Sequence, residues 1–363
     1  MVRGVQRLRF LMALVTAIAL LVAGCAKSAD EGTAAASGGN GDGGSEASQQ
    51  VARTEGDTCT YEEYNGGVEQ VDLAEATIGF AQSEKEANPF RIAETQSIKD
   101  EAAKRGINLI TTNAESDLNK EISDIQSMID QGADALVISP LNSEGLDPAL
   151  NYAKENGVPI MTIDRLLTTK EPCEDYIGWV GSDFVEQGRR AAQAMMRVTG
   201  DEGDVAILLG APGVNVTTDR NEGFLSELEE QGSNLNIVFE QAADYVREKG
   251  QQVTEQIIQQ HSDINAIYAH NDEMALGAVA ALQAAGYEPG DVKIITIDGT
   301  QGAVQGVVDG WISGVIESNP RFGPLAFQAL EDFYDGDGVT EVTIISDKEY
   351  TEENAEAELS NAY

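Results

Sequence analysis

Basic residues are scarce in this chain. Its 363 residues include 62 aspartates and glutamates but 23 lysines and arginines, which gives a formal net charge of -39. Nucleic acids and anionic lipid surfaces would repel such a chain, so neither is expected as a partner. The acidic excess has two explanations: a soluble surface, or a salt-rich habitat in which salt screens the repulsion between carboxylates. The sequence leaves both open.

Histidine and cysteine are also rare. The two histidines are His261 and His270, and no cysteine or histidine cluster has the spacing of a zinc site. The chain lacks a phosphate-binding glycine-rich loop with a lysine, and it lacks a nucleophile elbow. We therefore expect no metal and no cofactor. Nothing marks a catalytic acid among the 62 acidic residues, so an enzyme is not expected, and a secreted glycosidase is the catalytic alternative.

The N-terminus has the layout of a secretory signal. Arg3, Arg7 and Arg9 precede an uncharged stretch over residues 10–22. This stretch is shorter than the ~20 apolar residues of a membrane-spanning helix. It leads into Leu-Val-Ala-Gly-Cys, which resembles a bacterial lipoprotein signal and implies that Cys25 becomes the lipidated first residue. The alternatives are a simple signal peptide and a buried anchor.

A polar segment follows the predicted signal. Residues 26–50 are mostly Gly, Ser, Ala, Asn and acidic residues, which cannot bury enough apolar surface to become ordered. We predict a flexible tether that continues into an N-terminal extension up to residue 75. Such a tether lets a folded domain range over the membrane surface. The expected location is extracytoplasmic, on the outer face of the cell membrane and held by lipid only.

Two cysteines remain once Cys25 is assigned to lipid. Cys59 and Cys173 would both enter an oxidising compartment, where paired cysteines usually form disulfides. We predict one bridge that joins the N-terminal extension to the loop around Cys173. Two unrelated thiols are the alternative.

Short β-branched runs alternate with longer helix-period segments from residue 76 onward. This pattern is typical of parallel sheets covered by helices on both faces. The expected strands are 77–81, 108–111, 135–138 and 159–163 in a first series, and 204–209, 236–240, 266–269 and 292–297 in a second. Two similar series predict an α/β protein of two Rossmann-like lobes with parallel sheets, since about 300 residues exceed one small core.

Polar or aromatic residues follow several of the expected strands. Ligands of open α/β sheets bind at the carboxyl ends of the strands, so these residues are candidates for a binding site. The candidates are Asn88, Phe90, Asp164, Arg165, Asn271 and Asp298. They offer carboxylates, amides and a guanidinium for sugar hydroxyls, and a ring for the apolar C–H face of a sugar.

Each candidate also has a structural explanation. Asn88 and Asn271 could be helix N-caps, Asp164 and Arg165 a surface ion pair, and Asp298 part of a turn. Their shared position at strand ends favours a sugar site.

Four motifs in order and spacing carry a family resemblance. They are Asn-Pro-Phe at 88–90, Ile-Asp-Arg at 163–165, His-Asn-Asp-Glu-Met-Ala-Leu-Gly at 270–277 and Ile-Asp-Gly-Thr at 297–300. With these motifs the chain from about residue 76 resembles the periplasmic (type 1) sugar-binding proteins of ABC transporters, in the ribose-binding and galactofuranose-binding branch. The resemblance implies that the six candidates line a sugar cleft and that Tyr245 supplies a second ring.

The closer likeness within the family is to galactofuranose binders. Arg91 stands where ribose binders have a second Phe, and Glu86 is matched to a carboxylate of galactofuranose binders. Thr218 replaces an arginine of ribose binders, while Arg220 remains as a candidate. Ser318 stands in place of a glutamine, so no contact is assigned to it. These departures imply a furanose-form sugar such as galactofuranose; for Arg91 and Arg220 the alternative is a surface or ion-pair role.

The resemblance also implies a hinge. The chain would cross between lobes near residues 182–183, 317–318 and 345–346. The resulting lobes are 76–181 with 319–344, and 182–318 with 345–363. A sugar that contacts both lobes would favour the closed form, which family members present to a permease through exposed carboxylates.

The expected function is that of a monomeric solute-binding lipoprotein. It would capture a monosaccharide and deliver it to the permease of an ABC importer. The alternative is a sensor that presents the bound sugar to a receptor kinase.

Overall fold

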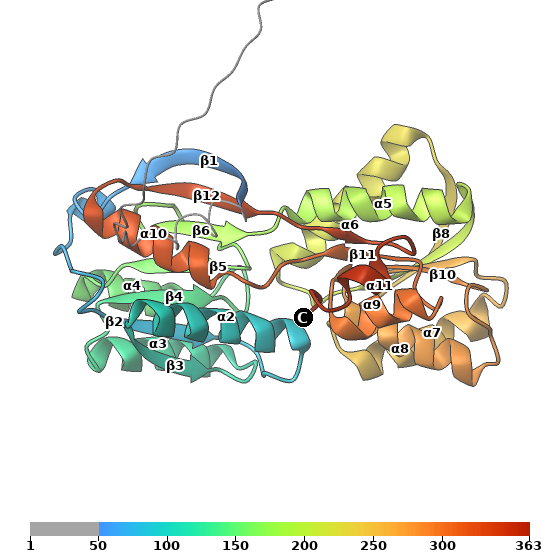
Figure 1. Cartoon of the computed structure of the whole chain (residues 1–363), viewed down its shortest axis with the longest axis horizontal. Helices are drawn as coiled ribbons and strands as arrows, with labels where there is room; N and C mark the ends of the chain where they lie inside the picture. The colour runs from blue at the N-terminus through green and yellow to red at the C-terminus, as the bar shows by residue number, and fades with distance from the viewer. Residues whose placement is uncertain (1–50) are drawn as a thin grey trace, which may run out of the picture. The chain divides into compact units, whose positions relative to one another are not determined.

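The computed structural model describes residues 51–363. These residues form two α/β lobes, each built on its own sheet (Figure 1). The strands in each sheet are parallel except for one antiparallel edge strand. The predicted fold class is therefore confirmed. The predicted signal, Cys25 and the tether over residues 26–50 lie outside the described residues.

The first lobe contains a seven-stranded sheet. In sheet order its strands are β1 (Val51–Cys59), β12 (Val339–Ile345), β6 (Gly178–Gly181), β5 (Ile160–Ile163), β4 (Ala135–Ser139), β2 (Thr77–Gln82) and β3 (Asn108–Asn113). Every residue of β4 and β5 is buried, as expected for parallel strands covered on both faces. The polar loops that follow these strands are therefore held by a rigid core.

The helices of the first lobe begin at capping residues or prolines. They are α2 (Pro89–Arg105), α3 (Leu118–Asp130), α4 (Asp147–Asn156) and α10 (Gly323–Asp335), with a 3-10 helix, η1 (Tyr64–Gly66), before β2. The side chain of Asn88 accepts a hydrogen bond from the Phe90 N–H, and Asp117 caps α3 in the same way. Pro89 at the first position of α2 gives up no hydrogen bond, because that N–H would have no partner in the helix.

The second lobe contains a six-stranded sheet. In sheet order its strands are β13 (Glu349–Tyr350), β11 (Gly314–Glu317), β10 (Lys293–Asp298), β9 (Ala266–Ala269), β7 (Glu202–Leu209) and β8 (Asn234–Ala242). Its helices are α5 (Phe184–Thr199), α6 (Asn215–Gln231), α7 (Arg247–Gln260), α8 (Asp272–Ala284), α9 (Gln301–Val308) and α11 (Ala355–Glu358).

Helices α5 and α6 approach each other closely enough to require glycine. A Cβ atom at Gly223 of α6 would lie 2.0 Å from the carbonyl oxygen of Val185 in α5, so no larger residue fits without a shift. This contact fixes α6 against α5. It thereby also places Arg220, which lies one turn before Gly223 on α6.

The N-terminal extension forms a strand that the sequence did not predict. Strand β1 is almost entirely exposed along its length and is held by antiparallel pairing with β12. It ends at Cys59, which forms the predicted disulfide with Cys173, with 5.3 Å between the Cα atoms. Composition gave no signal for β1 because its order depends on a partner strand distant in the sequence.

The described chain passes between the two sheets three times. The first crossing (residues 182–183) connects β6 to α5, and the second (318–322) connects β11 to α10. The third (346–348) connects β12 to β13 and begins one residue after the expected boundary, because β12 extends to Ile345. All three crossings leave the carboxyl ends of strands.

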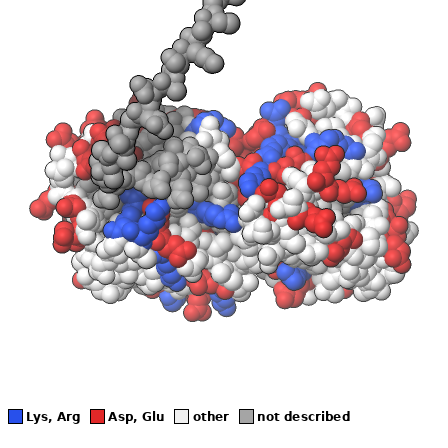
Figure 2. Space-filling view, viewed as in Figure 1, with Lys and Arg blue, Asp and Glu red and all other residues white. Residues whose placement is uncertain are grey.

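The surface is strongly acidic. Aspartates and glutamates are spread over the visible face of both lobes, with lysines and arginines between them (Figure 2). Across residues 51–363, no helix is long and apolar enough to cross a membrane.

Candidate functional site

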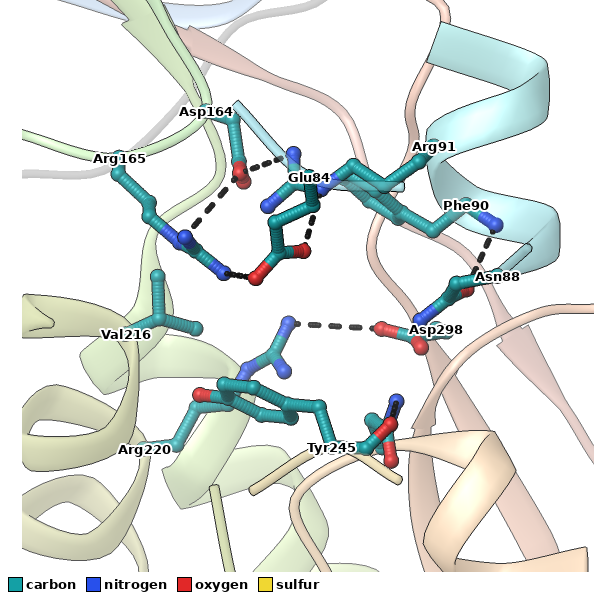
Figure 3. Close-up of a pocket in the computed structure, with 11 residues that line it drawn as sticks. Glu84, Asn88, Phe90, Arg91, Asp164, Arg165, Val216, Arg220, Tyr245 and Asp298 are labelled. Carbon is teal, nitrogen blue, oxygen red and sulfur yellow. Dashed lines mark hydrogen bonds and ion pairs between the residues drawn. The ribbon is translucent and has the colours of Figure 1, made fainter. Parts of the chain in front are cut away.

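A cavity is lined by residues of both lobes (Figure 3). The lining residues are Glu84, Asn88, Phe90, Arg91, Asp164 and Arg165 from the first lobe, and Val216, Arg220, Tyr245, Asn271 and Asp298 from the second. Most of them follow the carboxyl ends of strands, where parallel sheets bind ligands.

All of the predicted site residues except Glu86 line this cavity. Glu86 is exposed on the loop before α2, so the prediction for Glu86 is wrong. The cavity carboxylate of this loop is Glu84, two residues nearer to the end of β2. The strand-end rule alone would have favoured Glu84, but the family alignment pointed to Glu86. Val216 was also missed, since an apolar residue near a helix start gives no distinctive signal.

Glu84 joins the two arginines of the first lobe. It accepts a hydrogen bond from Arg91 Nε at 2.9 Å and another from Arg165 Nη2 at 2.8 Å. Burial by itself would raise the pKa of Glu84, but the charges of Arg165 and Arg91 outweigh it and lower the pKa to about 2. Glu84 is therefore ionised at neutral pH and holds both guanidinium groups at the cavity.

Arg91 is surrounded by carboxylates. Its Nη1 lies 2.7 Å from Asp164 Oδ2 and 2.9 Å from Glu94 Oε2. Glu94 is fully buried behind the cavity, and its burial raises its pKa although Arg91 opposes this. Both interpretations of Arg91 made from the sequence therefore apply: it lines the cavity, and it is an ion-pair residue.

Arg220 is the cationic group of the second lobe. Its Nη1 donates to the His270 carbonyl at 2.6 Å, and its Nη2 lies 3.7 Å from Asp298 Oδ1. Burial raises the pKa of the Asp298 carboxyl well above its ordinary value, even though Arg220 lowers it. The oxygens of this carboxyl group can accept a hydrogen bond from a hydroxyl group of a ligand.

Two aromatic rings contribute to the lining, one from each lobe. Phe90 contacts the Phe322 ring edge to face, with 6.4 Å between centroids. Tyr245 has a left-handed backbone conformation (φ 62°), and its hydroxyl lies 2.8 Å from Thr217 Oγ1. The Tyr245 ring fits only because Gly210 lies beneath it, where a Cβ atom would lie 2.0 Å from Cζ.

The two asparagines of the cavity are also helix caps. Asn88 Oδ1 accepts from the Phe90 N–H at 2.9 Å, and Asn271 Oδ1 accepts from the Met274 N–H at 3.0 Å. Both asparagines nevertheless line the cavity. The capping and binding explanations are therefore compatible, because each cap bond uses the oxygen and leaves amide N–H groups for other partners.

The formal charges of the lining residues balance. Three arginines face three carboxylates, those of Glu84, Asp164 and Asp298. Such a cavity gains little from an anionic or cationic ligand and suits a neutral molecule with many hydroxyl groups. Within residues 51–363, no group of three or more His, Cys, Asp or Glu side chains is arranged to hold a metal ion.

The lobes contact each other directly beside the cavity. The Asn215 N–H at the start of α6 donates to Ser143 Oγ at 2.8 Å. The side chain of Asn215 accepts from the Leu166 N–H at 3.1 Å. Since Ser143 and Leu166 belong to the first lobe and Asn215 to the second, these bonds are available only while the lobes are together.

Known proteins are similar to this chain in sequence and in structure. Residues 78–337 match the family described as a periplasmic binding protein domain. The chain is 37% identical over 263 residues to the ribose import binding protein of Bacillus subtilis, which covers 72% of this chain and 83% of that protein. It is 32% identical to the galactofuranose-binding protein of Escherichia coli, over 79% of this chain and 91% of that protein.

A solved structure is similar over the same region. It is the periplasmic binding protein component of the arabinose ABC transporter from a Shewanella species, bound to L-arabinofuranose. The two chains are 32% identical with a TM-score of 0.75, over 78% of this chain and 95% of that one.

Proposed function

The chain belongs to the periplasmic binding protein family, and we propose that it captures a monosaccharide between its two lobes and delivers it to an ABC importer. The observation that carries this proposal is the cavity itself, in which both lobes present charge-balanced hydrogen-bonding groups and an aromatic ring. A ligand that contacts both lobes favours the form in which they are closed. The relatives named for import binding support the role in delivery.

We propose a furanose-form sugar, such as galactofuranose, as the preferred ligand. Arg91 supports this choice, because it lines the cavity at the position where ribose binders carry a second Phe. Thr218 also supports it, because it lines a different hollow of the surface and adds no guanidinium to the cavity. Relatives that bind galactofuranose and L-arabinofuranose lend further support.

We propose that the chain acts as a monomer on the outer face of the cell membrane. Its link to the membrane would be lipid on Cys25, followed by the tether over residues 26–50. The charge of the chain supports a lipid link over adsorption, since an anionic bilayer repels a net charge of -39.

Calorimetric titration of the mature chain tests sugar capture. The panel comprises ribose, arabinose, galactose and fructose, together with methyl glycosides locked as furanose or pyranose rings. Trp179 offers a second signal, because its indole N–H donates to the Asp164 carbonyl at 2.9 Å beside the cavity. We expect saturable binding of one sugar per chain, tightest for a furanose, with the sugar recovered unchanged.

Two results would overturn the proposal. One is the absence of binding at micromolar concentrations of every sugar in the panel. The other is cleavage of the methyl glycosides, which would indicate a glycosidase.

Delivery is tested separately by sugar uptake in cells that lack the gene. Loss of uptake supports import, whereas unchanged uptake with a lost transcriptional response to the sugar supports sensing.

A further inference from the structure

One carboxylate lies where the three crossings between the lobes meet. Asp347 belongs to the third crossing. Its Oδ1 accepts from Ser182 Oγ of the first crossing at 3.2 Å and from the Asn319 N–H of the second at 2.9 Å. A single side chain therefore bonds to both other segments that connect the lobes.

Gln187 connects this carboxylate to the cavity. Its Nε2 donates to Asp347 Oδ2 at 2.8 Å, and its Oε1 accepts from Arg220 Nε at 2.9 Å. Gln187 lies on α5 and is only 1% exposed, so water cannot readily replace either bond. Arg220 in turn faces Asp298 across the cavity lining. Two side-chain contacts thus link a group at the binding site to the junction of the crossings.

The amide of Gln187 can serve both neighbours in only one orientation. Its nitrogen must face Asp347, which only accepts when ionised, and its oxygen must face Arg220, which only donates. Arg220 cannot accept a hydrogen bond and ionised Asp347 cannot donate one. The orientation of the Gln187 amide therefore ties the position of Arg220 to that of Asp347. The same Nε2 also lies 3.3 Å from the Glu317 carbonyl, at the end of β11 and next to the second crossing.

We propose that Gln187 and Asp347 are positioning residues that couple Arg220 to the three crossings, so that sugar contact at Arg220 and closure of the lobes stabilise each other. This inference rests on the proposed sugar-binding function. It assigns a role in binding to two residues that do not line the cavity. Coupling of this kind requires that the bonded arrangement differ between the open and closed forms, because only differential contacts shift such an equilibrium.

Asp347 is a buried carboxyl group with several charged neighbours. Burial raises the pKa of Asp347 to about 6, although Gln187 and the other donors lower it. Several charged groups surround this pair. They are Arg190 of α5, which donates to the Asp347 carbonyl, Glu317 of β11, Lys348 of the third crossing and Arg220 of α6.

The first test compares sugar affinity in Asp347→Asn, Gln187→Met and the double variant. Each single change removes a bond of the link while nearly preserving side-chain size. We expect each to weaken the binding of the preferred sugar about tenfold, and the double variant to be little weaker than either single one, because residues in one network are not additive. The control is Asp332→Asn on α10, which alters an equivalent bond from Gln328 Nε2 at 2.8 Å far from the crossings.

The second test uses a pH profile, which loss of packing alone would not change. Gln187→Glu places two carboxylates together, so at pH 7.5 they repel and the link to Asp347 is lost. At pH 5.5 a shared proton restores one hydrogen bond between them. The quantity compared is the sugar affinity of this variant divided by that of the unchanged chain at the same pH. We expect this ratio to rise at least severalfold between pH 7.5 and pH 5.5.

Four outcomes would overturn the inference. If the unchanged chain binds no sugar, the proposed function fails and the inference with it. If the unchanged chain binds sugar but Asp347→Asn and Gln187→Met bind it equally well, the inference is wrong and the function stands. Additive losses in the double variant, or a Gln187→Glu ratio that does not vary with pH, would likewise contradict coupling. Thermal melting of each variant identifies any that fails to fold, and the remaining variants still decide.

Discussion

Arg91 neutralises carboxylates in the part of the cavity formed by the first lobe. It is 4% exposed and donates to Glu84, Glu94 and Asp164. Its removal would leave buried carboxylates without a partner, which is more costly than the loss of an exposed pair. A variant at this position therefore affects folding as well as sugar choice.

Replacement of Arg91 by Met should lower the free energy of unfolding by about 3–5 kcal/mol. The matched control is Arg197→Met, which removes an exposed ion pair with Glu349 and should cost less than about 1 kcal/mol. Urea unfolding of the three proteins measures both effects. Equal losses in the two variants would show that Arg91 is not a buried ion-pair residue.

Glu121 is a buried acid outside the cavity. It accepts from the Leu141 N–H at 3.2 Å, and burial raises its pKa from 4.5 to about 8. The folded chain therefore keeps this proton up to about pH 8, whereas the unfolded chain loses it near pH 4.5. Because the folded state binds more protons in this range, the free energy of unfolding falls as the pH rises from about 4.5 to about 8.

The Glu121→Gln variant should lose this dependence on pH. At pH 8.5 we expect it to be more stable than the unchanged chain by at most about 5 kcal/mol, while at pH 4.5 the two should be similar. Unfolding by urea at several pH values measures the difference. A variant that is less stable than the unchanged chain at pH 8.5 would contradict the raised pKa.

At the scale of elements, the start of α6 provides a contact between the lobes. Asn215 bonds to Ser143 and Leu166, and it lies outside the cavity lining. Asn215→Ala should therefore speed sugar release about fivefold to tenfold, with a smaller change in the association rate, since interface changes act mostly on dissociation. Stopped-flow fluorescence measures both rates.

The control for this prediction lies on the same helix. Asn221→Ala removes a side chain whose amide donates to Glu240 at 3.5 Å, within the second lobe. Its release rate should match that of the unchanged chain. If Asn215→Ala also leaves the release rate unchanged, the bonds that the Asn215 side chain accepts from Leu166 and Ser143 do not contribute to the closed form.

Some elements could be predicted from the sequence and others could not. Strands β4 and β5 are fully buried and mostly apolar, which the β-branched pattern identifies. Strand β6 is Gly-Trp-Val-Gly, with glycine at Gly178 because a Cβ atom there would lie 2.8 Å from the Thr340 carbonyl oxygen. Close packing against a distant strand thus requires glycine in place of the β-branched residues that normally mark a strand.

The candidate site was predictable to a similar degree. Asp164 directly follows β5 and Asp298 is the last residue of β10, so both stand out in the sequence. Glu84 was missed because the family alignment pointed to Glu86, and its pairing with Arg91 and Arg165, which the fold brings to it from other elements, leaves no local pattern. The link between Gln187 and Asp347 spans 160 residues and has no local pattern.

At the scale of the whole molecule, the net charge of -39 influences stability and location. Carboxylates that repel one another destabilise a compact chain, and added salt screens them: the Debye length falls from ~10 Å at 0.1 M to ~3 Å at 1 M. We expect the midpoint of urea unfolding to rise as sodium chloride is increased from about 0.1 to about 1 M. A midpoint that falls or stays constant would show that repulsion does not limit the stability of this chain.

The central claim is that one sugar binds between the two lobes, and a crystal structure of the chain with the sugar selected by titration tests it most directly. We predict a single sugar in the cavity, in contact with Asp164 of the first lobe and Arg220 of the second. A sugar that contacts one lobe alone, or that lies outside this cavity, would contradict the account.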